Sequence, residues 1–68
     1  MLREELLARG GLPWEEARAL AYEEPGVYSL RVGDELHLIG PKGLLARLDL
    51  NGILLWIADE EVWDEEGL

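Results

Sequence analysis

The chain has 68 residues, a mass of 7.7 kDa and a formal net charge of −9 at pH 7. This length allows a single domain, residues 1–68, and a domain so small is marginally stable alone, so we expect a homodimer. The 49% of hydrophobic residues and the lack of cysteine exclude disorder and a disulfide or cysteine–metal scaffold. Fifteen acidic residues against six basic ones oppose binding to nucleic acid or to an anionic membrane surface.

The distribution of apolar residues indicates where in the cell the protein is expected. No apolar run approaches the ~20 residues of a membrane span, and residues 1–5 lack the pattern of a signal peptide, so we expect a cytoplasmic protein. Many Glu and Arg residues, one Asn and no Gln or Thr are typical of proteins from thermophiles.

Residues 1–24 predict a short helical hairpin. Leu2, Leu6 and Leu7 fall on one face of a first helix, which ends at Gly10 and Gly11. Pro13 suits the first position of a second helix, and Glu15 and Glu16 favour its positive end. The apolar stripe of the second helix comprises Trp14, Ala17, Leu20 and Ala21.

From residue 27 to residue 58 the period changes from 3.6 to 2, which predicts a four-stranded antiparallel meander. The predicted strands are Val27–Val32, Leu36–Ile39, Leu44–Leu50 and Ile53–Ile57. Asn51 and Gly52 predict a two-residue type I′ turn that pairs Leu50 with Ile53. Residues 41–43 predict a three-residue loop that pairs Gly40 with Leu44 and Leu38 with Ala46.

The first hairpin loop is chosen by the position of the apolar residues. A loop of residues 33–35 pairs Val32 with Leu36 and keeps the apolar side chains of both strands on one face, whereas a loop of residues 33–34 separates them. We therefore expect the longer loop. The helical hairpin then packs on one continuous apolar face, giving an α+β domain. That face comprises Tyr28, Leu30, Val32, Leu36, Leu38, Leu44, Ala46, Leu48, Leu50, Ile53, Leu55 and Ile57.

Residues suited to catalysis are few. Ser29 and His37 are at best diagonal neighbours, no G-x-S-x-G motif surrounds the serine, and His37 lacks a partner at metal-ligand spacing. The adjacent pairs of acidic residues are expected on exposed helix turns, where both carboxylates are solvated, and no glycine-rich phosphate loop is present. We therefore expect that the protein is not an enzyme and that it has no cofactor and no metal site.

The opposite face of the predicted sheet carries the candidate binding residues. The expected register places Arg31, His37, Arg47 and Trp56 in one row across the strands. Val27, Ile39, Leu45 and Leu54 lie beside it, and apolar residues ringed by charge are typical of interfaces. A homodimer interface is the preferred interpretation, while a solvated face and a site for an anionic or aromatic ligand stay open.

The last ten residues, 59–68, form an acidic tail or a short helix that carries a charge of −6. An acidic run of this kind is usually just solvated, and that interpretation stays open. Val62 and Trp63 interrupt the acids, however, so they are candidates to anchor the tail on a sheet face or on a dimer mate. The tail carboxylates would then neutralise the cationic row.

These features favour a protein–protein interaction or regulatory module that acts as a homodimer, with a basic protein as a further possible partner. The alternative is a small enzyme or a domain that binds an anionic ligand, using the row Arg31, His37, Arg47 and Trp56.

Overall fold

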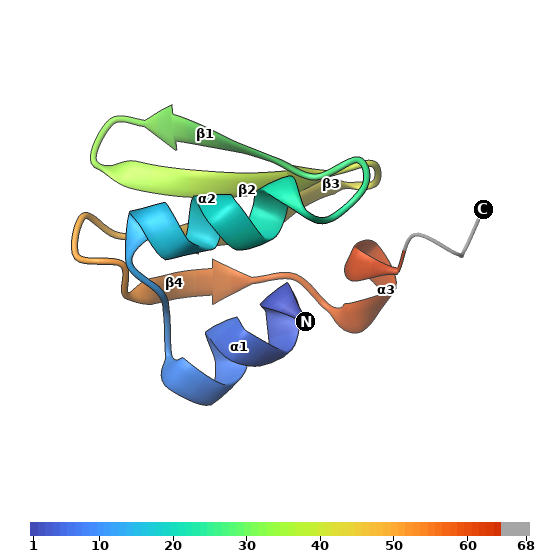
Figure 1. Cartoon of the computed structure of the whole chain (residues 1–68), viewed down its shortest axis with the longest axis horizontal. Helices are drawn as coiled ribbons and strands as arrows, with labels where there is room; N and C mark the ends of the chain where they lie inside the picture. Colours follow the sequence, from blue (N-terminus) through green and yellow to red (C-terminus); the bar gives the residue numbers. More distant parts are fainter. Residues whose placement is uncertain (65–68) are drawn as a thin grey trace.

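In the computed structural model of the chain, residues 1–64 are described, and they form helices packed on an antiparallel sheet (Figure 1). The helices are α1 (Leu2–Arg9), α2 (Trp14–Tyr22) and α3 (Glu60–Trp63). The strands are β1 (Tyr28–Val32), β2 (Glu35–Gly40), β3 (Gly43–Leu48) and β4 (Leu54–Ile57), in the order β1-β2-β3-β4. The predicted α+β fold with a four-stranded meander is confirmed.

Helix α1 ends where the sequence predicts, whereas α2 begins one residue later than predicted, at Trp14, with Pro13 as its N-cap. The chain leaves α1 at Gly10, which has a left-handed φ of 73°, and its N–H donates to the carbonyl of Leu6. Helix α2 follows Pro13 and has two glutamates in its first turn. Leu7, predicted to share the apolar face of α1, is half exposed. None of the helices in residues 1–64 has the length and apolar composition needed to cross a membrane.

The core lies between the helices and one face of the sheet. Helix α2 runs along the sheet near β1 and β2, and α1 lies beside β4 (Figure 1). Trp14, Leu20, Val62 and Trp63 pack against this core while half buried. The fully buried cluster comprises Leu2, Leu6, Leu12, Ala17, Ala21, Leu36, Leu38, Leu45, Ala46 and Leu48.

The connection between α1 and α2 is bonded to the turn between β3 and β4. The N–H of Leu12 donates to the carbonyl of Gly52 over 2.9 Å, and the N–H of Leu54 donates to the carbonyl of Gly10 over 2.9 Å. Gly11 forms an antiparallel bridge with Ile53. The helical hairpin is therefore joined by its backbone to the edge of the sheet at the start of β4.

The first hairpin differs from the prediction. Its loop has two residues, Gly33 and Asp34, so Leu30 lies opposite His37 and Val32 lies opposite Glu35. Gly33 has a φ of 61°, as the first loop residue of a type II′ turn requires. The local turn chemistry outweighs the grouping of apolar residues, because β1 is an edge strand whose side chains stay largely exposed.

The other two loops are also one residue away from the prediction. The β2–β3 loop is the pair 41–42, so Gly40 lies opposite Gly43, and a bulge that directs Leu45 into the core restores the predicted pair of Leu38 and Ala46. Leu45 fits there because its side chain occupies the space that a side chain on Gly40 would fill.

The β3–β4 turn is not type I′. That type needs a positive φ at both loop residues, and only Gly52 of the pair Asn51–Gly52 has one. The Asp49 carboxylate accepts hydrogen bonds from the N–H groups of Asn51 and Ile53, each over 2.9 Å, and this favours a longer loop. A second irregularity, in the pairing of β3 with β4, follows Arg47.

The predicted buried face is accordingly right only at its centre. Leu36, Leu38, Ala46 and Leu48 are buried as predicted, and Ile57 is half buried. Leu44 is also half buried, but the bulge at Leu45 turns it to the opposite face. The remaining predicted members are exposed, namely Tyr28, Leu30, Val32, Leu50, Ile53 and Leu55.

Candidate functional site

The candidate site is the sheet face opposite the helices, here called the outer face. The register places on it side chains from all four strands: Tyr28, Leu30, Val32, Glu35, His37, Ile39, Leu44, Arg47 and Trp56. His37, Arg47 and Trp56 lie directly across from one another, as predicted. These three residues are aligned as predicted because, in β2–β4, each one-residue difference in loop length is compensated by a bulge or irregularity further along the strands.

Arg31 does not belong to the row. The shorter first loop gives its place opposite His37 to Leu30 and turns Arg31 to the helix side of the sheet. There its guanidinium carbon lies 5.6 Å from the centroid of the Trp14 ring, and its Nε donates to the carbonyl of Gly33 over 2.8 Å. Trp14 also faces Arg18 at 5.7 Å.

The centre of the outer face is an ionic cluster of Glu35, His37 and Arg47. Arg47 donates from Nε and Nη2 to the two carboxylate oxygens of Glu35, over 2.9 and 3.0 Å. His37 Nε2 lies 3.0 Å from Glu35 Oε1, and the imidazole is the donor because an ionised carboxylate only accepts. These bonds, with Arg47 the larger influence, lower the pKa of Glu35 from 4.5 to about 2, and Glu35 in turn raises the pKa of Arg47.

Sequence reasoning missed Glu35 because it assigned this residue to the first loop. The signal that could have found it is its spacing from His37, since residues i and i+2 of a strand share a face. Arg47 reaches Glu35 as a diagonal neighbour across β2 and β3. The Arg47 guanidinium is therefore engaged by a bidentate pair with this carboxylate.

The ionic cluster leads to a prediction on acid stability. Because folding lowers the pKa of Glu35, its ionised form stabilises the fold above about pH 4.5, and this contribution is lost as the pH falls from about 4.5 to about 2. We expect Glu35→Gln to lower the melting temperature at pH 6 and to have a smaller effect at pH 2. Circular dichroism melts between these pH values measure it. The matched control is Glu23→Gln, an exposed carboxylate outside the sheet; a Glu35 variant that melts parallel to this control at every pH contradicts the assignment.

Large apolar side chains surround the ionic cluster and are open to solvent. Tyr28, Leu30 and Val32 of β1 are 58%, 49% and 45% exposed, and Trp56 of β4 is 43% exposed. Within residues 1–64, no helix packs on this side of the sheet. The outer face therefore combines an internally neutralised centre with an apolar margin on both edge strands.

The predicted tail anchors lie on the protein's own core. Val62 and Trp63 belong to α3 and are half buried against the core, next to β3. The carboxylate that neutralises Arg47 comes from Glu35 rather than from the tail. Residues 65–68, which are part of the predicted acidic tail, lie outside the described residues.

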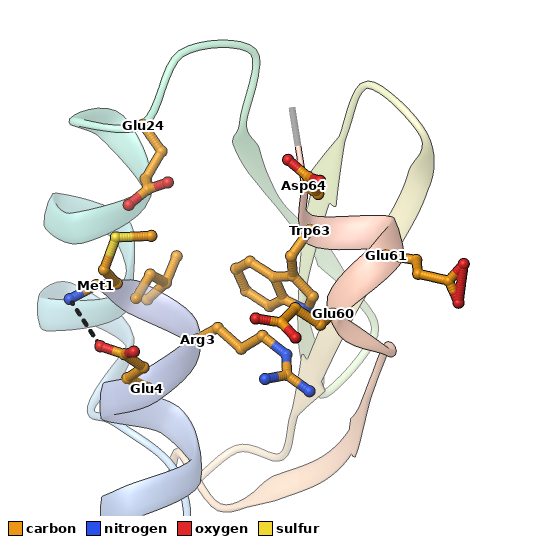
Figure 2. A pocket seen from close by; sticks show the side chains of 9 residues that line it. Met1, Arg3, Glu4, Glu24, Glu60, Glu61, Trp63 and Asp64 are labelled. Carbon is orange, nitrogen blue, oxygen red and sulfur yellow. Dashed lines mark ion pairs between the residues drawn. The ribbon is translucent and has the colours of Figure 1, made fainter. Parts of the chain in front are cut away.

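Trp63 borders a pocket of about 590 Å³ between the start of α1, the end of α2 and α3. Figure 2 shows its ring directed into this space from α3, with Arg3 and Glu60 nearby. The indole N–H is shielded from solvent and has no hydrogen-bond partner among the described residues. The lining is predominantly acidic: Met1, Leu2, Arg3, Glu4, Glu24, Glu60, Glu61, Trp63 and Asp64.

No group of three or more His, Cys, Asp or Glu side chains in the described part of the chain is arranged to hold a metal ion. In the comparisons with known proteins, no family model, no curated protein and no solved structure matches this chain.

Proposed function

We propose that this chain is a protein–protein interaction module that acts as a homodimer through the outer face of its sheet. The observation that carries the proposal is the exposure of Tyr28, Leu30, Val32 and Trp56 on one uncovered face. Apolar patches with a charged surround are typical of protein interfaces, and aromatic residues are enriched there.

The charge distribution supports the same face. The chain carries −9, yet the charges of Glu35 and Arg47 cancel at the centre of the outer face. Two copies that meet here bring together surfaces with little net charge, whereas contact through most other surfaces opposes acids to acids. The net charge therefore favours this orientation over the others.

The ligand-binding alternative is less well supported. An anionic ligand needs cations that are available, and Glu35 already accepts hydrogen bonds from both Arg47 and His37. Arg31, the third cation of the predicted row, faces the helix side. These observations favour the interaction module.

The test is the molar mass in solution, measured by light scattering from micromolar to near-millimolar chain concentration in low and high salt. We expect a mass near twice 7.7 kDa. The two tyrosines supply a matched pair of variants, because Tyr28 lies on the outer face and Tyr22, 91% exposed, lies on α2. We expect Tyr28→Asp to weaken dimerisation at least about tenfold, or about 1.4 kcal/mol, and Tyr22→Asp to leave the mass unchanged.

Two outcomes overturn the proposal. One is a wild-type mass that stays at 7.7 kDa across the whole concentration range. The other is a Tyr28→Asp variant that keeps the wild-type circular dichroism spectrum and still dimerises as strongly as Tyr22→Asp.

A further inference from the structure

Strand β1 forms an open edge of the sheet. It pairs with β2 alone, in a regular register over all five residues from Tyr28 to Val32. Natural edge strands are usually protected from pairing by proline, lysine, a bulge or a covering segment. Within residues 1–64, β1 has no proline, lysine or bulge, and its one charged residue is Arg31, which turns to the helix side.

The two-residue loop fixes which backbone groups of β1 face outward. The residues that flank such a loop, Val32 and Glu35, form a hydrogen-bonded pair, and bonded and non-bonded pairs then alternate along the ladder. Tyr28, Leu30 and Val32 therefore direct their N–H and C=O groups to β2. Ser29 and Arg31 direct theirs to the open edge.

We infer that a second copy of this chain pairs with β1 in antiparallel orientation, with the twofold axis at Leu30. This inference rests on the proposed homodimer but places the contact at the β1 edge of the outer face, where Tyr28, Leu30 and Val32 lie, rather than across the whole face. Ser29 lies opposite the partner's Arg31 and Arg31 lies opposite the partner's Ser29, which gives four backbone hydrogen bonds between the outward groups. The two four-stranded sheets become one sheet of eight strands.

The side-chain pattern of β1 is symmetric about Leu30, as an isologous interface requires. On the outer face Leu30 meets the partner's Leu30, and Tyr28 meets the partner's Val32 at both ends, so three apolar pairs form. On the helix side, serine faces arginine. A register centred on Arg31 would oppose two guanidinium groups, and one centred on Ser29 would leave Val32 without an apolar partner.

The arginine side chain leaves this edge accessible. Arg31 is tied to the carbonyl of Gly33 and to the ring of Trp14, both on its own subunit. At the other side of the sheet, the start of β4 is already occupied by the connection between α1 and α2. Among residues 1–64, the edge at β1 is therefore the one that presents outward backbone donors and acceptors along a full strand.

Disulfide trapping tests the register. Because the chain has no cysteine, any disulfide that forms must involve the introduced residue. At a non-hydrogen-bonded antiparallel pair the Cα atoms lie about 4.5 Å apart, within disulfide range. We expect Leu30→Cys to form a covalent dimer at least about tenfold faster than Tyr28→Cys, whose copies would lie about 13 Å apart along the strand. We expect an equimolar mixture of Tyr28→Cys and Val32→Cys to form the mixed disulfide.

Amide hydrogen exchange of the wild-type protein, followed by NMR, tests the same geometry without substitutions. We expect the Ser29 and Arg31 amides to gain protection as the chain concentration rises. The Tyr28 and Leu30 amides, already bonded to β2, serve as internal controls and stay protected throughout.

The outcomes separate this inference from the proposed function. A dimeric mass with unprotected Ser29 and Arg31 amides, or with Tyr28→Cys trapped as fast as Leu30→Cys, overturns the edge pairing and leaves a face-to-face homodimer. A monomeric mass at every concentration overturns both.

Discussion

Replacing Gly11 with alanine is expected to remove a large part of the protein's free energy of unfolding. Gly11 has a φ of 139°, which L side chains rarely adopt, and an added Cβ would collide with the carbonyl oxygen of Gly52 and lie 2.9 Å from the backbone N of Leu54. Both obstacles are backbone atoms, and the backbone bonds that flank Gly11 hold them in place. We expect a cost of at least about 3 kcal/mol, against a total stability of about 3–10 kcal/mol for a domain of this size.

The neighbouring residue provides the control. Gly10 also has a positive φ, 73°, but a Cβ there would meet nothing within 4 Å. Gly10→Ala should therefore cost only the left-handed strain, about 1–2 kcal/mol. Urea unfolding at a fixed chain concentration compares the two variants. Equal losses in both would show that steric collision at Gly11 is not the dominant effect.

The second large effect is expected at Leu6. Its side chain is 0% exposed and lies in the cluster that joins α1 to the sheet. Truncation removes buried methyl groups and leaves a cavity, and such changes cost about 2–5 kcal/mol. We expect Leu6→Ala to lose that much in chemical unfolding.

Leu7 is the matched control for Leu6, because it is the same residue type, one position later in the same helix, and is 47% exposed. We expect Leu7→Ala to cost about 1 kcal/mol or less. A larger loss at Leu7 than at Leu6 would mean that α1 is rotated about its axis relative to the described packing.

Much of the fold could be predicted because the relevant signals are local. Gly10 and Pro13 bound the two helices, and the change to a period of two after Gly26 marks the sheet. The stripe of α2 is confirmed, since Ala17 and Ala21 are buried and Trp14 packs on the core. These features depend on a few adjacent residues, and tertiary packing reinforces them.

The registers could not be predicted from the same signals, because each depends on a competing interaction. At Asn51 the competitor is the Asp49 carboxylate, which bonds to two loop amides. At Gly33 the two-residue turn determines the register of an edge strand that the core does not constrain. The assumption that every apolar side chain of β1 faces the helices was therefore wrong.

The errors in predicted loop length had unequal consequences for the candidate site. His37, Arg47 and Trp56 were aligned correctly, since the bulges restored the parity of β2, β3 and β4. In the first hairpin nothing offsets the loop error, so Arg31 leaves the outer face and Glu35 joins it. Because the first loop is one residue shorter than predicted, the outer face carries a neutralised cluster of Glu35, His37 and Arg47 in place of the predicted cationic row.

The bonding of the α1–α2 connection to the start of β4 limits how far copies of this chain can assemble. A sheet with two open edges can add strands at both sides and grow into a fibre. Here the backbone of residues 10–12 already occupies the start of β4, through the bonds to Gly52 and Leu54. In the dimer that we propose, pairing at β1 would then close after two copies, and the close backbone contact at Gly11 and Gly52 would oppose growth at the other edge as well as join the helices to the sheet.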